Sequence, residues 1–472
     1  MRRFRQSMAF VATLGAGALW CAAAVSPALP ALPPLPALPP LIDAYRSGDM
    51  SAFDALLESG ADVNASEPDG ATALLWASYR DDTVTAERLI RAGADVNRGN
   101  DLGATPLWAA SQNGGGAMVA LLIEAGAEPN QGLLLGETPL MVAARSGHAG
   151  VVEQLIMAGA EPDARGARDQ TALMWAAAQD HPDVVETLTR HGADVHLRSE
   201  VWSQVMAVDP HGHPEYNKDI PHGGDTALMF AARVGSLEAA RILVDAGADV
   251  NDTDAWGISA TLLAAHSDFT DLAAYLLEQG ADPDAARPGF AAIHSAIMHR
   301  NDRLVGLLLD HGADPNLTLK TWTPTRRSSS DLSFTPELVG ASPLWLAARF
   351  GSPGMMRMLV DHGADPMFVH HAQRVRSGFT GDAGQMEYFE TTPLMAALGM
   401  GAGRAWFQPA REEREALALE SVRYAVDLGV DVNRVDVGGQ TALDAARRLR
   451  YASVVDFLLA NGAVSGDESD RN

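Results

Sequence analysis

Apolar and polar positions alternate along most of the chain with the period of short helices, in segments that end at glycine. Residues 136–163, GETPLMVAARSGHAGVVEQLIMAGAEPD, carry apolar residues at helical spacing on two successive stretches. Thr138 is placed to cap the first stretch, and Pro139 follows where a helix needs no amide hydrogen. Gly147 and Gly159 stand where the two stretches end. The pattern predicts a pair of short helices.

This helix pair recurs along the chain. A Gly-Ala-acid motif closes each pair, and its first five copies are spaced by 33 residues. A fixed period of this length predicts a solenoid. The distance from the capping position to the closing glycine is 21 in nine copies, so the helix pair tolerates almost no change in length. The closing glycines are Gly60, Gly93, Gly126, Gly159, Gly192, Gly247, Gly280, Gly312, Gly363, Gly429 and, in degenerate form, Gly462.

The recurring motif resembles the ankyrin repeat, whose consensus runs Gly-x-Thr-Pro-Leu-His-x-Ala-Ala, then Gly-His, then Val-Val-x-x-Leu-Leu and Gly-Ala-Asp-Val-Asn. The capping motif stands here as Thr72-Ala73-Leu74, Thr105-Pro106-Leu107 and Thr392-Pro393-Leu394, among other copies. The resemblance implies an all-α repeat solenoid of helix-turn-helix units, each with a hairpin finger. About eleven copies would fill residues 39–464, followed by a polar tail at 465–472.

Length variation is concentrated in the connections between repeats. The usual distance of 12 from closing glycine to the next cap grows to 34, 30 and 29, which places insertions near 197–222, 317–339 and 367–390. A fourth insertion, near 400–415, falls between the two helices of one pair, and we expect it to lengthen the second helix from Glu415. The resemblance implies that the three longer fingers project beside the concave face.

The N-terminal region predicts export. Residues 1–24 run from basic to apolar to small, which is the order of a cleavable signal peptide, with retention as a membrane anchor the less favoured alternative. Residues 25–38 form a Pro/Ala/Leu-rich linker, expected as a polyproline II spacer, with a proline-motif ligand as the alternative. Cys21 is the only cysteine, so the cleaved chain would lack disulfides and thiol chemistry. We therefore expect a periplasmic or secreted protein.

Charge limits the class of partner. The chain has 35 Lys and Arg against 60 Asp and Glu, a net charge of -25 that would repel nucleic-acid phosphates. No phosphate loop, Gly-x-Ser-x-Gly elbow or His-Glu-x-x-His helix is present, so we expect no catalytic residues, no cofactor and no enzymatic activity. We expect a scaffold that binds another protein.

The resemblance also indicates which side chains face a partner. Five of them are arginines, which favour an acidic partner unless they pair with neighbouring Asp or Glu. Aromatic residues of the insertions are further candidates, unless they fold back over neighbouring repeats. We expect Trp108 to pack between repeats, with a partner-binding aromatic stripe as the alternative, and Trp76 and Trp175 to pack in the core. The candidates are Tyr79, Arg80, Gln112, Arg145, Gln179, Arg233, His266, Arg349, Phe350 and Arg448 on the inner helices, and Trp202, Tyr216, Trp322, Phe334 and Phe379 in the insertions.

The histidines of the first insertion leave a second function open. His211, His213 and His222 are weak candidates for a metal site, because imidazoles two residues apart are common in polar loops as well as at metals. The alternative to a scaffold is therefore a metal-binding or ligand-binding protein, or a cryptic enzyme, centred on the insertions. A secreted effector that acts on a host protein is the third possibility.

Overall fold

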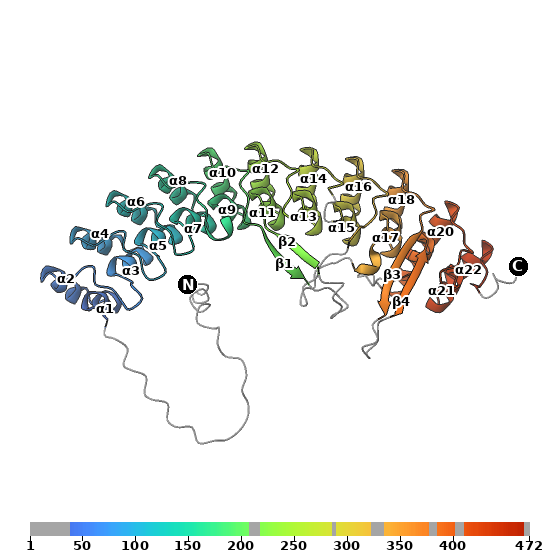
Figure 1. The fold of residues 1–472 in the computed structure, drawn as a ribbon, viewed down its shortest axis with the longest axis horizontal. Coiled ribbons are helices and arrows are strands. Elements are labelled where there is room, and N and C mark those ends of the chain that lie inside the picture. The colour runs from blue at the N-terminus through green and yellow to red at the C-terminus, as the bar shows by residue number, and fades with distance from the viewer. Residues whose placement is uncertain are drawn as a thin grey trace, which may run out of the picture.

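The helices stack side by side into a curved, elongated arc. The computed structural model describes residues 38–206, 218–285, 289–321, 335–376, 385–401 and 410–466. Within these ranges the α-helices form eleven successive pairs, each an inner helix on the concave side followed by an outer helix on the convex side (Figure 1). The fold is therefore the all-α repeat solenoid that the sequence predicts.

The helices are short and regular. The inner helices are α1 (Pro40–Ser47), α3 (Ala73–Tyr79), α5 (Pro106–Asn113), α7 (Pro139–Ser146), α9 (Ala172–Ala178), α11 (Ala227–Val234), α13 (Ala260–His266), α15 (Ala292–Met298), α17 (Pro343–Arg349), α19 (Pro393–Ala397) and α21 (Ala442–Leu449). The outer helices are α2 (Met50–Glu58), α4 (Thr83–Arg91), α6 (Gly116–Glu124), α8 (Ala149–Met157), α10 (Pro182–Arg190), α12 (Leu237–Asp245), α14 (Thr270–Glu278), α16 (Asp302–Asp310), α18 (Pro353–Asp361), α20 (Arg411–Asp427) and α22 (Ala452–Ala460).

Local chemistry fixes where each helix begins and ends. In the pair α7–α8, the Thr138 hydroxyl accepts a hydrogen bond from the Met141 amide at 3.3 Å, and Pro139 fills the first helical position. Gly147 ends α7 with φ 80°, a left-handed conformation that glycine adopts without steric cost. The same hydroxyl cap recurs at other inner helices, for example at Thr105 and Ser259.

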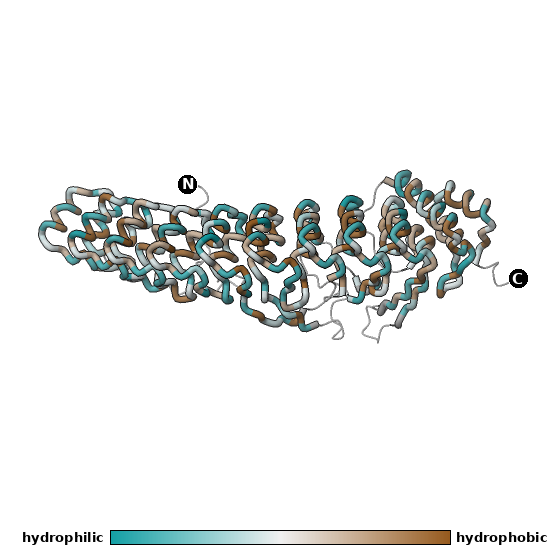
Figure 2. Tube along the Cα trace, turned by 90° about the horizontal axis from the view of Figure 1, so that it is seen from above, coloured by the Kyte–Doolittle hydropathy of each residue, from teal (hydrophilic) through white to brown (hydrophobic). Residues whose placement is uncertain are grey.

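The core lies between the inner and outer helices along the whole arc. Buried apolar side chains form one continuous cluster from Leu41 to Ala396, and a second cluster runs from Leu394 to Ala463. Figure 2 shows apolar residues distributed along the length of the stack and not gathered at one centre. Each repeat therefore buries its apolar face against its two neighbours, as in other solenoids.

An asparagine side chain joins consecutive repeats on the turn after the outer helix. The Asn130 amide nitrogen donates to the Gly159 carbonyl at 3.0 Å, and its oxygen accepts from the Glu161 amide at 2.9 Å. Asn316 makes the same two bonds to Gly363 and Asp365, across the second insertion. The insertion therefore leaves the stacking geometry unchanged. Matching pairs of bonds are made by Asn64, Asn97, Asn251 and Asn433.

Two of the insertions contain β-hairpins. Strands β1 (Trp202–Met206) and β2 (Lys218–His222) pair antiparallel, with Trp202 opposite His222. Strands β3 (His370–Arg376) and β4 (Gln385–Thr391) pair antiparallel, with His370 opposite Thr391. Both hairpins lie on the side of the inner helices (Figure 1).

The fourth insertion differs from its expected boundary. Helix α20 begins at Arg411 and not at Glu415, so it spans 17 residues where most outer helices have 9. Glu412 and Glu413 occupy its first turn, where negative charge interacts favourably with the helix dipole. Residues 411–415, REERE, therefore all belong to helix α20.

His294 is a fully buried inner-helix histidine. Its Nδ1 accepts a hydrogen bond from the Ala291 amide at 3.0 Å, and its Nε2 lies 2.8 Å from the Leu317 carbonyl oxygen. Because a carbonyl only accepts, Nε2 carries the proton and the ring is neutral. Burial lowers the pKa of His294 to about 4, and burial lowers the pKa of His370 to about 4 as well.

We expect Asn130→Ala to lower the free energy of unfolding by about 1–2 kcal/mol, because two inter-repeat hydrogen bonds are lost. Asn130→Asp is the matched control: it keeps the acceptor, as Asp163 does when it accepts from the Asp194 amide at 2.9 Å. Asn130→Asp should lower the free energy of unfolding by less than Asn130→Ala does. Urea denaturation measures both, and an alanine variant as stable as the parent would contradict the role of the bridge.

We expect the protein to lose stability as the pH falls from about 6.5 to about 4. Between these pH values a histidine of the unfolded chain is protonated, whereas His294 and His370 of the folded chain are neutral. Protonation therefore favours the unfolded chain in this range, and above about pH 6.5 the histidines are neutral in both states. His294→Met introduces the residue found at Met141 and should reduce the loss by up to about 3 kcal/mol. Unfolding free energies at pH 7.5 and pH 4 test this, and an equal loss in parent and variant would disprove it.

Candidate protein-binding surface

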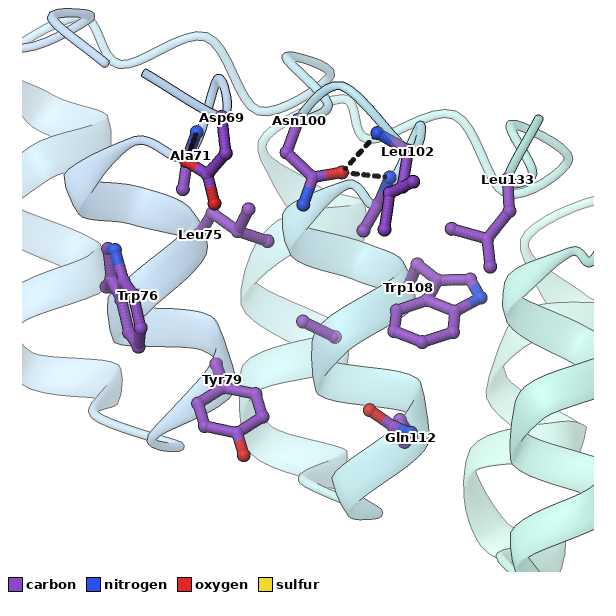
Figure 3. A pocket seen from close by; sticks show the side chains of 12 residues that line it. Asp69, Ala71, Leu75, Trp76, Tyr79, Asn100, Leu102, Trp108, Gln112 and Leu133 are labelled. Atoms are coloured by element: carbon purple, nitrogen blue, oxygen red, sulfur yellow. Dashed lines mark hydrogen bonds between the residues drawn. The ribbon is translucent and has the colours of Figure 1, made fainter. Parts of the chain in front are cut away.

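The concave face carries an open, apolar cavity between the first repeats, which we call the aromatic hollow. Its volume is about 360 Å³. Helices α3 and α5 form its floor, and the turns that precede α3, α5 and α7 form its rim (Figure 3). The side chains that line it are Asp69, Ala71, Leu75, Trp76, Tyr79, Asn100, Leu102, Ala104, Trp108, Ala109, Gln112 and Leu133.

One small residue on α5 contributes to the hollow. The fourth residue of an inner helix is large in several repeats, for example Trp76 in α3, Val142 in α7 and Trp175 in α9. In α5 that position is Ala109, which is 3% exposed and lies between the walls formed by Trp76 and Trp108. The methyl side chain leaves the space that a larger residue would fill.

Aromatic rings and cations surround this space. Trp76 and Tyr79 meet edge to face, with ring centroids 6.1 Å apart and an angle of 89° between the planes. The Arg46 guanidinium lies 4.7 Å from the Trp76 ring centroid, and the Arg80 guanidinium lies 5.0 Å from the ring of Tyr45. Such contacts hold aromatic rings in fixed orientations. The hollow is therefore formed before any partner binds.

The rim combines one fixed turn with one exposed apolar side chain. The Asn100 side-chain oxygen accepts from the amides of Leu102 and Ala104 at 3.1 and 2.9 Å, which fixes the turn (Figure 3). Leu102 itself is 63% exposed. An exposed leucine beside Trp108 extends the apolar surface out of the hollow.

A second, polar cavity lies at the base of the β1–β2 hairpin and measures about 300 Å³. Trp202 stacks on His222 at 4.5 Å, with 22° between the rings, and the Arg168 guanidinium lies 4.6 Å from the Trp202 ring. Asp254 also lines this cavity, and burial raises the pKa of its carboxyl group. The aromatic and charged groups here contact one another, so they hold the hairpin against the repeats.

The predicted arginines are engaged by the protein itself. Arg145 pairs with Glu137 at 2.7 Å, and Arg233 pairs with Asp225, whose side chain is 9% exposed, at 2.8 Å. Arg448, at the other end of the arc, donates to the Gln440 side chain at 2.9 Å. Of the two interpretations of the inner-helix arginines, intramolecular pairing is the one that Arg145 and Arg233 support.

Of two other candidates, Phe350 is buried and Arg349 is half-buried. Phe350 is 3% exposed and belongs to the continuous core, so its prediction as a partner-facing residue is wrong. Its ring packs inward where α17 ends. Burial lowers the pKa of the neighbouring Arg349 to about 10, and its guanidinium lies 3.4 Å from the Met400 carbonyl. Arg349 is therefore also a structural residue.

The remaining inner-helix candidates lie at different depths. Tyr79 and Gln112 line the aromatic hollow. Arg80 and Gln179 are exposed. The backbone carbonyl of His266 accepts a hydrogen bond from the His299 ring at 2.7 Å. The structure brings together only Tyr79 and Gln112 of this set in one described cavity.

The insertion candidates divide into two groups. Trp202 and His222 stack on each other at the base of β1–β2. The described residues contain no group of three or more His, Cys, Asp or Glu side chains that could hold a metal ion. Tyr216, Trp322, Phe334, Phe379, His211 and His213 lie outside the described residues.

The third insertion folds back on the stack at its base. The Trp345 indole nitrogen donates to the Thr391 hydroxyl at 3.1 Å, and the rings of Trp345 and His370 lie 4.3 Å apart. His370 and Thr391 are completely buried, whereas Tyr388 is 56% exposed. The base of the β3–β4 hairpin is therefore part of the core, and Tyr388 remains accessible.

Comparison with known families decides the classification. The model of the family described as ankyrin repeats (3 copies) matches residues 41–133, 118–199 and 228–318, which is more than half of the chain, and the model described as ankyrin repeat matches residues 339–371. The chain belongs to the ankyrin-repeat family. Ankyrin repeats generally mediate protein–protein interaction.

Curated relatives match this ankyrin-repeat chain over part of their length. Human BCL-6 corepressor-like protein 1 is 34% identical over 113 residues, covering 23% of this chain and 6% of that protein. The putative palmitoyltransferase ZDHHC13 of Danio rerio is 28% identical over 272 residues, covering 53% of this chain and 37% of that protein. Mouse protein phosphatase 1 regulatory subunit 27 is 40% identical over 67 residues, covering 14% of this chain and 44% of that protein. The chain thus spans less than half of each relative.

Among solved structures, the human ASB11 ankyrin repeat domain is similar to part of this ankyrin-repeat chain. It has 28% sequence identity and a TM-score of 0.42, and the match covers 52% of this chain and 99% of that domain. In the described part of the present chain, no helix combines the length and apolarity needed to cross a bilayer.

Sequence reasoning missed the central residues of the hollow. The sequence predicts Trp76 in the core and Trp108 between repeats, with an aromatic stripe as the alternative for Trp108, yet both indoles are only partly buried and line the open cavity. The signal in the sequence is Ala109, since an alanine between two tryptophan-bearing positions leaves one side of each ring uncovered. The fourth position alone does not locate the site in this ankyrin-repeat protein, because α19 and α21 carry Ala396 and Ala445 there; in α5 the small residue is flanked by two tryptophans.

Proposed function

We propose that this ankyrin-repeat chain is a non-enzymatic scaffold that binds a partner protein on its concave face, with the aromatic hollow as the main anchoring site. The observation that carries the proposal is the open apolar cavity formed by Trp76, Tyr79 and Trp108. Tryptophan and tyrosine are enriched among residues that dominate binding energy. A partner side chain that fills the hollow would bury aromatic surface that is now accessible.

Rigidity supports the same function. The hollow lies on a floor of helices whose ends are capped and whose repeats are joined by Asn64 and Asn97. A preformed site binds without first losing conformational entropy. We further propose that all eleven helix pairs are ankyrin repeats, which would extend the concave face well beyond the hollow and allow the hairpins to make additional contacts.

The proposed setting is outside the cytoplasm. It rests on residues 1–24, whose basic, apolar and small-residue order is that of a signal peptide.

We expect the chain to be recovered from periplasm or medium, shortened by about 24 residues, because cleavage is expected near Ala24. Fractionation of the producing cells, with mass spectrometry of the intact protein, measures both location and length. Full-length protein in the cytoplasm would contradict export, and full-length protein in the membrane fraction would favour the anchored alternative.

We expect Trp76→Ala to reduce recovery of the partner about tenfold, as loss of an anchor worth about 1–2 kcal/mol should. The matched control is Trp175→Ala, because Trp175 occupies the same position of α9 in a similar sequence but does not line the hollow. Both variants lose a half-buried indole and should be destabilised alike. Quantitative cross-linking and co-purification from the producing cells compares them, and equal partner recovery would contradict the proposal.

A further inference from the structure

The aromatic hollow has the chemistry of a site for an extended, proline-rich segment. Its walls are aromatic faces and aliphatic side chains, and the polar groups on its lining are the side chains of Asp69, Tyr79, Asn100 and Gln112. Polyproline II segments have no internal hydrogen bonds and dock against aromatic-lined grooves, where proline rings pack on tryptophan and tyrosine. The hollow therefore suits a proline-rich segment better than a charged one.

The chain carries such a segment next to the hollow. Residues 27–40, PALPALPPLPALPP, contain seven prolines among fourteen residues and no charged side chain. The segment leads directly into α1, the helix that packs beside α3. An uncharged apolar segment is also compatible with this lining, since its one carboxylate, Asp69, accepts from the Ala71 amide at 3.1 Å and the nearby guanidinium of Arg46 is paired with Glu67 at 2.5 Å.

We propose that residues 27–37 of this chain occupy the aromatic hollow, so that a partner must displace them to reach Trp76 and Trp108. This inference rests on the proposed function, because it concerns the same site. The occupant is a segment of the chain itself, and a proline-rich segment of a partner would compete with it for the hollow.

The segment is long enough to reach. Inner helices pack about 8–10 Å apart, so the far wall of the hollow on α5 lies about 20 Å from α1. Polyproline II advances about 3.1 Å per residue, and about seven residues cover that distance. Eleven residues, 27–37, are available. Leu38 occupies the position in the first repeat that Ala71 occupies in the second, just before the helix cap. Because Ala71 lines the hollow, the segment that precedes Leu38 joins the stack at the edge where the hollow lies.

The test is a competition that uses the full chain. The probe is a fluorescent synthetic peptide, PALPALPPLPAL, corresponding to residues 27–38. It is titrated against the unchanged chain and against a variant in which residues 27–37 are replaced by Gly and Ser at the same length. We expect the Gly-Ser variant to bind the peptide at least tenfold more tightly, because a tethered segment competes at a millimolar effective concentration.

Two leucines at equivalent positions locate the binding site. Leu102 and Leu135 each precede the glycine of their turn and are 63% and 77% exposed, but only Leu102 lines the hollow. In the Gly-Ser variant, Leu102→Ser should weaken peptide binding at least fivefold, and Leu135→Ser should leave it unchanged. Both are surface changes that leave the core intact, so circular dichroism should show the same helix content.

The outcomes separate this inference from the proposed function. No binding to the Gly-Ser variant, or binding that Leu102→Ser leaves unchanged, overturns the inference. The inference is also overturned if the peptide binds the unchanged chain and the Gly-Ser variant with equal affinity and Leu102→Ser weakens that binding. This result would show that the hollow is open to segments of other proteins. The comparison of Trp76→Ala with Trp175→Ala judges the proposed function independently of all three results.

Discussion

The asparagine bridge between consecutive turns is the constraint on which the rest of the architecture depends. A side chain such as Asn130 satisfies a carbonyl and an amide of the next repeat together, and it does so only when the two turns lie at one separation. The bridge from Asn316 shows that this separation survives an insertion between the repeats. Because the stacking distance is fixed, length varies mainly in the connections between repeats, with the longer helix α20 as the exception within a pair, and composition varies in the side chains on the concave face.

The aromatic hollow follows from that constraint. In a compact globular core, a small residue is compensated when neighbouring elements move closer, and the cost of a cavity falls with the extent of that collapse. Here α3 and α5 are held apart by the turns, so Ala109 leaves accessible space between Trp76 and Trp108. The space beside Ala109 thus forms without any change in how the helices of these repeats pair.

The fold could be predicted from the sequence because residues within each repeat determine where its helices begin and end. Thr138, Pro139 and Gly147 carry local signals that act over a few residues, and eleven helix pairs follow them. The site could not be predicted in the same way, since whether Phe350 or Trp76 is accessible depends on the size of side chains one repeat away. The pairing of Arg145 with Glu137 likewise depends on a turn that the helix pattern does not describe.

The charges indicate what kind of recognition the concave face supports. Exposed carboxylates such as Glu58, Glu124 and Glu153 lie on the outer helices, while the inner-helix arginines Arg145 and Arg233 are neutralised by their own carboxylates. A net charge of -25 therefore repels acidic proteins at long range, and Arg145 and Arg233 offer no free cation to offset that repulsion. What remains accessible on the inner face of the first repeats is aromatic and aliphatic surface. Binding there is governed by burial, which selects shape and apolarity and depends little on salt.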